Sequence, residues 1–174
     1  MKKIIYILFM IVSFNGFSQL GLEVGFSSSK AKVSGGNVSV STDALSGLGV
    51  GLVAGIPVSD RFKLETGLSF AFAKVDGESS TSWGIPLTAK IYTNPENGFH
   101  LRAGVGYSAT TEDVDTSIVK KGAFLGGFGL GYDINEKFSV VAEYSTQLSN
   151  SAGSSLDGIK IKSSGFGVSL QYFF

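Results

Sequence analysis

Apolar residues alternate with small or polar residues along most of the chain after residue 19. In residues 20–27, for example, Leu, Val and Phe alternate with Gly, Glu and Ser. A period of two puts successive side chains on opposite faces, which is typical of a β-strand with one apolar face. The pattern therefore predicts eight strands, at residues 20–27, 47–56, 62–72, 83–91, 99–108, 124–134, 138–144 and 165–174.

The connections between these strands alternate in length. Long connections cover residues 31–43, 73–80, 111–121 and 149–158, and short ones cover residues 57–61, 93–98 and 135–137. Long outer loops and short periplasmic turns are typical of outer-membrane barrels. Four long and three short connections would close eight strands and leave both ends of the barrel domain on the periplasmic side.

The chemistry of the two strand faces separates a barrel from a soluble β-sandwich. The apolar face is continuous and rich in aromatic residues near both strand ends, as expected where aromatic girdles meet the membrane interfaces. The opposite face is mostly Gly, Ser and Thr, which fits the narrow interior of a small barrel. We therefore predict an all-β fold, an eight-stranded antiparallel transmembrane up-and-down β-barrel.

Proline and glycine mark special positions in this scheme. Pro57 and Pro95 are expected in two short turns, where a missing N–H does no harm. Pro86 falls inside the fourth strand, so we expect a bulge or a weakened pairing there. The glycine-rich stretches at residues 47–55 and 126–131 are not phosphate-binding loops, because no helix follows either one. Glycine should instead allow tight curvature and leave room for larger side chains in the lumen.

The first residues have the layout of a secretory signal peptide. A basic start is followed by an apolar run at residues 4–14 and by small residues before residue 19. That run is shorter than the roughly 20 residues that a spanning helix needs. We expect residues 1–18 to be a cleaved signal peptide and residues 19–174 to form a single outer-membrane β-barrel domain.

Composition agrees with a membrane barrel and excludes several other classes. Charged residues make up 16% of the chain, below the roughly 25% of a typical soluble domain, and cysteine is absent. A disulfide scaffold and a cysteine metal site are therefore excluded. Residues 1–18 hold two of the 14 basic residues and none of the 14 acidic ones, which leaves the remainder weakly acidic. Such a balance gives no electrostatic basis for binding nucleic acid.

The chain resembles the small outer-membrane β-barrel family of OmpA, OmpX and PorT-like domains. The most specific element is the final strand, whose alternation resembles the terminal signal that the barrel-assembly machinery reads in this family. The residues of this assembly signal are Phe166, Val168, Leu170, Tyr172 and Phe174. Residues 85–92, which begin Ile-Pro-Leu, also resemble a segment of PorT-like members. The resemblance implies an outer-membrane location and leaves activity open.

Five charged residues fall on the polar face near the periplasmic strand ends. These residues are Glu23, Glu65, Lys90, Arg102 and Glu143. At similar heights in a narrow lumen they should pair, with Arg102 able to hold a carboxylate through two hydrogen bonds. The first interpretation is a structural plug of satisfied charges, and the alternative is a gated path for protons or ions.

No other residues indicate catalysis or metal binding. His100, the one histidine, is expected at the rim or in the lumen near a periplasmic turn, the wrong end for chemistry on outer-leaflet lipids. One histidine and no cysteine cannot build a transition-metal site. Trp83 at the outer end of the fourth strand is interpreted as an interfacial anchor. Acidic residues of the third outer loop, at 112, 113 and 115, are interpreted as solvation of an exposed loop.

These observations predict a non-enzymatic, monomeric barrel with no cofactor and no metal. We expect a sealed polar lumen and a structural or surface-interaction role in the cell envelope. Two alternatives stay open, a narrow gated channel and a membrane accessory of a protein secretion system. The expected partners are outer-membrane lipids, the barrel-assembly machinery during biogenesis, and an envelope or extracellular protein that contacts the loops.

Overall fold

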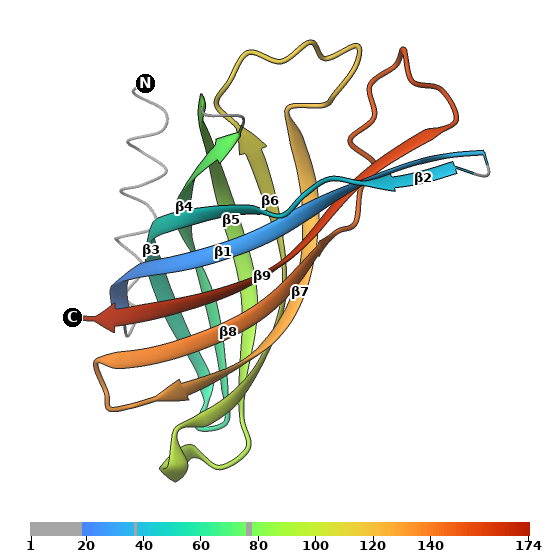
Figure 1. The fold of residues 1–174 in the computed structure, drawn as a ribbon. Coiled ribbons are helices and arrows are strands. Elements are labelled where there is room, and N and C mark those ends of the chain that lie inside the picture. The colour runs from blue at the N-terminus through green and yellow to red at the C-terminus, as the bar shows by residue number, and fades with distance from the viewer. Residues whose placement is uncertain (1–18, 37, 76–77) are drawn as a thin grey trace, which may run out of the picture.

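The structure is a computed structural model that describes residues 19–36, 38–75 and 78–174 (Figure 1). The predicted signal peptide at residues 1–18 lies outside the described residues. Within the described ranges, no helix is both long enough and apolar enough to cross a membrane.

Nine strands make up most of the described structure. They are β1 (Gln19–Gly35), β2 (Val38–Ser41), β3 (Leu45–Ser59), β4 (Phe62–Val75), β5 (Glu78–Tyr92), β6 (Phe99–Thr110), β7 (Gly122–Asp133), β8 (Phe138–Gln147) and β9 (Ile159–Phe173). A short 3₁₀ helix, η1 (Pro95–Asn97), lies between β5 and β6.

Eight of these strands close into an antiparallel barrel. Each of β3 to β8 pairs with the next strand in sequence, β1 pairs with β3, and β1 also pairs with β9. The β1–β9 pairing leaves no open edge in the barrel wall, which confirms the predicted up-and-down topology. The remaining strand, β2, pairs only with β1 and projects from the barrel with the ends of β1 and β9 (Figure 1).

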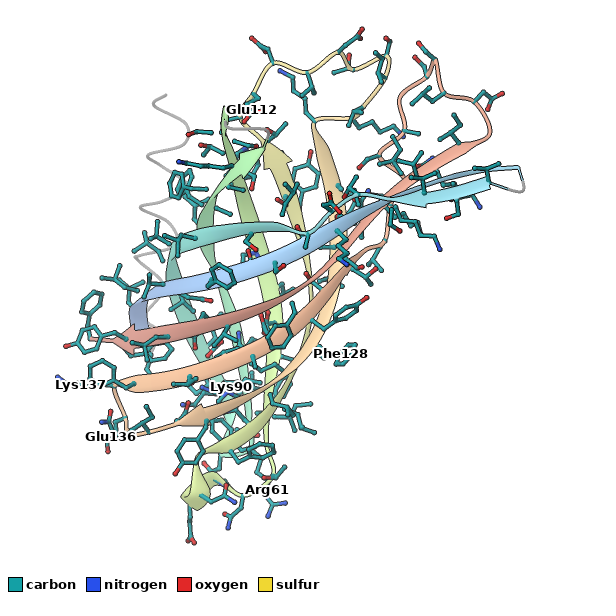
Figure 2. All side chains as sticks on the ribbon, viewed as in Figure 1. Arg61, Lys90, Glu112, Phe128, Glu136 and Lys137 are labelled. Atoms are coloured by element: carbon teal, nitrogen blue, oxygen red, sulfur yellow. The ribbon has the colours of Figure 1, made fainter. Side chains whose placement is uncertain are left out.

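Apolar side chains cover the outside of the barrel. Phe128 is 66% exposed and points away from the wall, whereas Lys90 is 2% exposed and lies in the interior (Figure 2). The same contrast holds along the strands, because exposed Leu, Val and Phe alternate with less exposed Gly, Ser and Thr. This inverted arrangement suits hydrocarbon as the surrounding solvent.

Pro86 weakens the pairing of β4 with β5, as the sequence predicts. Backbone partners run up to Thr66 opposite Leu87 and resume only at Ser69 opposite Gly84. On its other side Pro86 pairs with Gly106 of β6 without interruption. The Thr66 hydroxyl donates to the Pro86 carbonyl at 2.8 Å, so a side-chain hydrogen bond partly replaces the backbone hydrogen bonds missing between β4 and β5.

The prediction for Pro57 was wrong, whereas that for Pro95 is confirmed. Pro57 lies inside β3, beside a register shift between Pro57 and Ser59, and the turn to β4 consists of residues 60 and 61 alone. A bulge tolerates the missing N–H of proline as well as a turn does. Pro95 begins η1 in the turn between β5 and β6.

Two predicted long loops are largely strand. Residues 31–43 contain the end of β1 and all of β2, and residues 73–80 contain the paired ends of β4 and β5, up to Val75 opposite Glu78. Where a strand extends beyond the lipid, its residues no longer alternate between apolar and polar. The backbone hydrogen bonds between the strands nevertheless continue. The loops after β6 and β8 are long, as predicted.

Candidate functional site

Arg102 of β6 holds two carboxylates from other strands inside the barrel. Its Nη1 lies 2.5 Å from Glu65 Oε2 of β4, and its Nε donates to Glu143 Oε1 of β8 at 2.6 Å. The Arg102 and Glu65 side chains are only 5% and 4% exposed. A buried charge pair of this kind is held by direct charge-assisted hydrogen bonds.

Lys90 of β5 forms the second centre of the cluster. Its Nζ lies 2.8 Å from Asp133 Oδ1 of β7 and 3.6 Å from Glu65 Oε1. Tyr92 donates from its hydroxyl to Asp133 Oδ2 at 2.6 Å. Lys90 Nζ also lies 5.3 Å from the centre of the Tyr92 ring and 5.9 Å from that of Phe173. Glu65 therefore joins the arginine and the lysine into one network, called here the ionic layer, made of Glu65, Lys90, Arg102, Asp133 and Glu143.

Strand register explains why these residues meet. Lys90 lies directly opposite Arg102 in the β5–β6 pairing, and the next two strands place Gly129 and then Glu143 at the same level. Gly129 has no side chain, so the guanidinium of Arg102 reaches across β7 to Glu143. A Cβ on Gly129 would come within 2.6 Å of the Glu143 Cγ atom. The predicted role of glycine in making room for lumen side chains is confirmed at this position.

The ionic layer lies between two cavities of the lumen. The cavity on the side of the long loops has a volume of about 350 Å³ and is bordered by Glu65, Arg102 and Glu143. The cavity on the side of the short turns has a volume of about 430 Å³ and is bordered by Lys90 and Asp133. No residue lines both cavities. The arrangement can therefore block passage along the barrel axis, and its charges would have to separate before an ion could cross.

Four of the five predicted lumen charges belong to the ionic layer, and Glu23 does not. Glu23 of β1 accepts a hydrogen bond from Gln171 Nε2 of β9 at 3.1 Å and makes no ion pair with a described residue. The strand register explains why Glu23 lies apart from the ionic layer, because Glu23 is directly opposite Gln171 of β9 and Gly51 of β3.

Asp133 and Tyr92 were missed by the sequence analysis. Asp133 ends β7 beside a short turn, and Tyr92 ends β5. Both follow the inward alternation of their strands, because Asp133 is two residues beyond Gly131 and Tyr92 is two beyond Lys90. That alternation was the available signal, and the aromatic character of Tyr92 concealed it.

His100 is fully buried beside the ionic layer, in the lumen as the sequence analysis expected. Its Nδ1 lies 3.1 Å from the Gly98 carbonyl and 3.7 Å from Asp133 Oδ1. Its ring packs 5.3 Å from that of Tyr92, while Nε2 has no hydrogen-bond partner among the described residues. A Cβ on Gly131 would overlap the imidazole, so that glycine makes room for it.

The predicted assembly strand lies where the sequence placed it, whereas Trp83 lies inside β5, which begins five residues earlier at Glu78. Phe166, Val168 and Leu170 are exposed on the lipid face of β9. Phe174 follows β9 directly, and its N–H donates to the Leu20 carbonyl at 2.9 Å. The Trp83 ring lies 5.8 Å from that of Tyr107 near the outer end of β5. The assembly and anchoring roles themselves stay predictions.

The two long outer loops bind each other above the barrel. Lys120 N donates to the Ser151 carbonyl at 2.9 Å, Gly153 N to the Ile118 carbonyl at 2.7 Å, and Ser155 N to the Ser117 carbonyl at 2.8 Å. Gly153 permits this approach, because a Cβ there would collide with the backbone of Ser117. We call this pairing of residues 117–120 with residues 151–155 the loop platform.

Asn150 anchors the loop platform to β9. Its Oδ1 accepts from Ala152 N at 3.0 Å and from Ile161 N at 2.8 Å, while its Nδ2 donates to the Ile159 carbonyl at 3.0 Å. The two bonds to Ile159 and Ile161 hold the start of the loop against the first residues of the strand, and the bond from Ala152 stabilises the loop itself.

Two acidic side chains of the third outer loop bond within the loop, while Glu112 accepts from Thr81 N of β5 at 3.1 Å. Lys121 Nζ donates to Asp113 Oδ1 at 2.8 Å, which holds the pKa of that carboxyl below its usual value. The hydroxyl and the backbone N–H of Ser117 donate to Asp115 and lower its pKa as well. Among the described residues, no group of three or more potential ligands could hold a metal ion.

Comparison with known proteins gives one family and several distant structural neighbours. Residues 9–174 match the family described as outer membrane protein beta-barrel domain. The attachment invasion locus protein Ail of Yersinia pestis is similar in structure, with a TM-score of 0.54 and 14% identity over 90% of this chain and 98% of that one. Neisserial surface protein A has a TM-score of 0.49 and 14% identity over 88% of this chain and 97% of that one. No match is found among curated proteins.

Proposed function

Since the chain belongs to the family of outer membrane protein beta-barrel domains, we propose that it is a sealed, non-enzymatic barrel with a surface-interaction or structural role in the cell envelope. The family gives the outer membrane as its location and leaves the role within that membrane open. The likeness to Ail supports the fold alone.

The observation that best supports a surface-interaction role is the loop platform. Loops that served only to connect strands would need no hydrogen bonds to each other, whereas these two are held together by three backbone hydrogen bonds, and Asn150 fixes one of them to β9. Because the loops are already ordered, they would lose little conformational entropy when a partner binds to the exposed platform. Ile118, 48% exposed on this platform, is an apolar contact point for such a partner.

The chemistry of the interior supports a role without catalysis. The carboxylates of the ionic layer that could act as acid or base are already engaged by Arg102 and Lys90. His100 is fully buried beside the short turn at Gly98, away from the long loops. A general base must reach the proton that it removes, and this imidazole is closed to a substrate.

Site-specific photocrosslinking in intact cells tests the surface role. A crosslinking residue at Ile118 should capture an envelope or extracellular partner, because this side chain is exposed on the loop platform. The matched position is Lys137, exposed in the β7–β8 turn at the other end of the barrel (Figure 2). Capture from Lys137 alone would contradict the proposal and favour an accessory of a secretion system.

A narrow gated channel is the second candidate, and one observation favours it. The ionic layer is the barrier between the two lumen cavities, and it consists of charged side chains that could exchange partners. Arg102 holds two carboxylates at once, however, so opening would leave buried charges without partners. This cost supports a plug over a gate.

A further inference from the structure

Strands β1 and β9 change chemistry on their outer face where they leave the lipid. In β1 this face carries exposed Leu, Val and Phe up to Phe26, and in β9 it carries exposed apolar residues from the end of the chain back to Phe166. Beyond these two residues the same alternation places four exposed lysines on the face. This lysine patch consists of Lys30, Lys32, Lys160 and Lys162.

Register brings the four lysines together on one surface. Lys32 lies directly opposite Lys162, while Lys30 is opposite Ser164 and Lys160 is opposite Ser34. Side chains directly opposite each other in an antiparallel pair have Cβ atoms about 5 Å apart, and like charges there are destabilising. The fold therefore holds two positive charges together at a cost, which an anion bound between them would remove.

No acidic side chain on these strands neutralises the lysine patch. Residues 30–41 and 159–164 contain four lysines and no Asp or Glu. None of the four lysines forms an ion pair with another described residue, whereas Lys90, Arg102 and Lys121 all do. Asp43 and Asp157 lie just outside these ranges and form no ion pair with the four lysines, so the strands themselves present an excess of positive charge, complementary to a negatively charged partner.

The nearer lysines of the patch lie just beyond the level of the lipid headgroups. Lys30 and Lys162 stand four residues beyond Phe26 and Phe166, which is about 13 Å along a strand and about 10 Å along the membrane normal at a typical tilt. Headgroups extend roughly 5–8 Å beyond the hydrocarbon on each side. Lysine side chains are long and flexible and can reach back toward the membrane surface.

We propose that the lysine patch binds the phosphate groups of outer-leaflet lipids that lie beside β1 and β9. The patch continues the lipid-facing surface, so a lipid whose chains pack on Phe26 and Phe166 presents its headgroup to the lysines. The proposal rests on the outer-membrane location and is independent of the loop platform. Free phosphate lacks the acyl chains that would hold it there, so the surface is specific for the lipid form.

Lipid retention by the purified full-length protein tests the proposal. Protein in an uncharged detergent is titrated with diphosphoryl lipid A, and the retained lipid is counted by native mass spectrometry. The patch variant is Lys32→Gln/Lys162→Gln, and the matched control Lys120→Gln/Lys121→Gln removes the same charge from the loop after β6. At roughly fivefold per lysine, the patch variant should bind about 25-fold more weakly, while the control stays within about twofold of the wild type.

Three results would overturn the proposal. Equal loss of lipid A from the two double variants would mean that only net charge matters. Equal retention of phosphatidylcholine, which carries no net charge, would mean that packing of the acyl chains alone explains binding. Displacement of the lipid by millimolar inorganic phosphate would identify a free anion as the ligand. Thermal unfolding checks the fold, and the patch variant should be at least as stable as the wild type because it loses a like-charge pair.

Discussion

At the scale of single residues, Arg102 is the centre of the buried network. Its guanidinium forms an ion pair with Glu65, which is 3% exposed and surrounded by protein. Removal of one member of a buried pair leaves the other charge without compensation, which costs more than the pair itself contributes. The charge of Arg102 is therefore more important to the folded barrel than any surface charge.

Replacement of Arg102 by alanine should destabilise the barrel by about 3 kcal/mol, because Glu143 would lose its ion-pair partner and the buried Glu65 would keep only Lys90, at 3.6 Å. Thermal unfolding in detergent, followed by the fluorescence of Trp83, measures the change. The control is Arg61→Ala, which removes an exposed arginine from the β3–β4 turn (Figure 2). Equal unfolding temperatures for the two variants would show that the charges are not a coupled network.

Gly131→Ala should cost roughly 1–3 kcal/mol, because the new methyl group would overlap the His100 ring. Gly167→Ala is the control, since a Cβ there would meet its nearest atom at 3.5 Å, an ordinary contact. Thermal unfolding of both variants and of the double variant Gly131→Ala/His100→Ala checks the explanation. If the loss persists after the imidazole is removed, the glycine is needed for another reason.

At the scale of elements, the loop platform and the barrel wall should respond separately. Asn150→Ala removes two hydrogen bonds between the loop and β9 and one within the loop, so hydrogen exchange in residues 148–158 should accelerate by about tenfold or more. The reciprocal control is Asn135→Ala, whose side chain caps the β7–β8 turn at the other end. Faster exchange across the barrel strands in the Asn150 variant would contradict an independent platform.

Alternation predicted the barrel strands well because burial against lipid imposes a strict period of two. The same signal failed at residues 31–43 and 73–80, where strands continue into water and no apolar face is required. Pro57 was misplaced because a bulge and a turn accept proline for the same reason, the lack of an N–H. Local sequence does not distinguish the two.

The lumen cluster was predicted in part for a related reason. Alternation correctly put Glu65, Lys90, Arg102 and Glu143 on the inner face, but contacts across the lumen depend on the stagger between strands. Glu23 is therefore bonded to Gln171 instead, while Asp133 completes the network from the end of β7. The sequence therefore predicts which residues face the lumen. To predict which of them contact each other, the register between the strands must also be known.

At the scale of the whole molecule, the proposed function requires a closed lumen and an outer surface that makes the contacts with partners. Two cavities of about 350 and 430 Å³ border the ionic layer from opposite sides without sharing a lining residue. Eight strands give an interior that side chains can just fill, which agrees with a plug at this level. If the lumen is closed, the proposed contacts with lipids and proteins fall to the outer face, the lysine patch and the loop platform.

Single-channel recording in a planar bilayer tests the closed lumen most directly. The wild-type protein, inserted at neutral pH in a neutral lipid, should produce no discrete conductance steps, because Arg102 and Lys90 keep the ionic layer paired. Reproducible steps from the wild-type protein, with an amplitude that scales with salt concentration, would contradict the account and establish a channel.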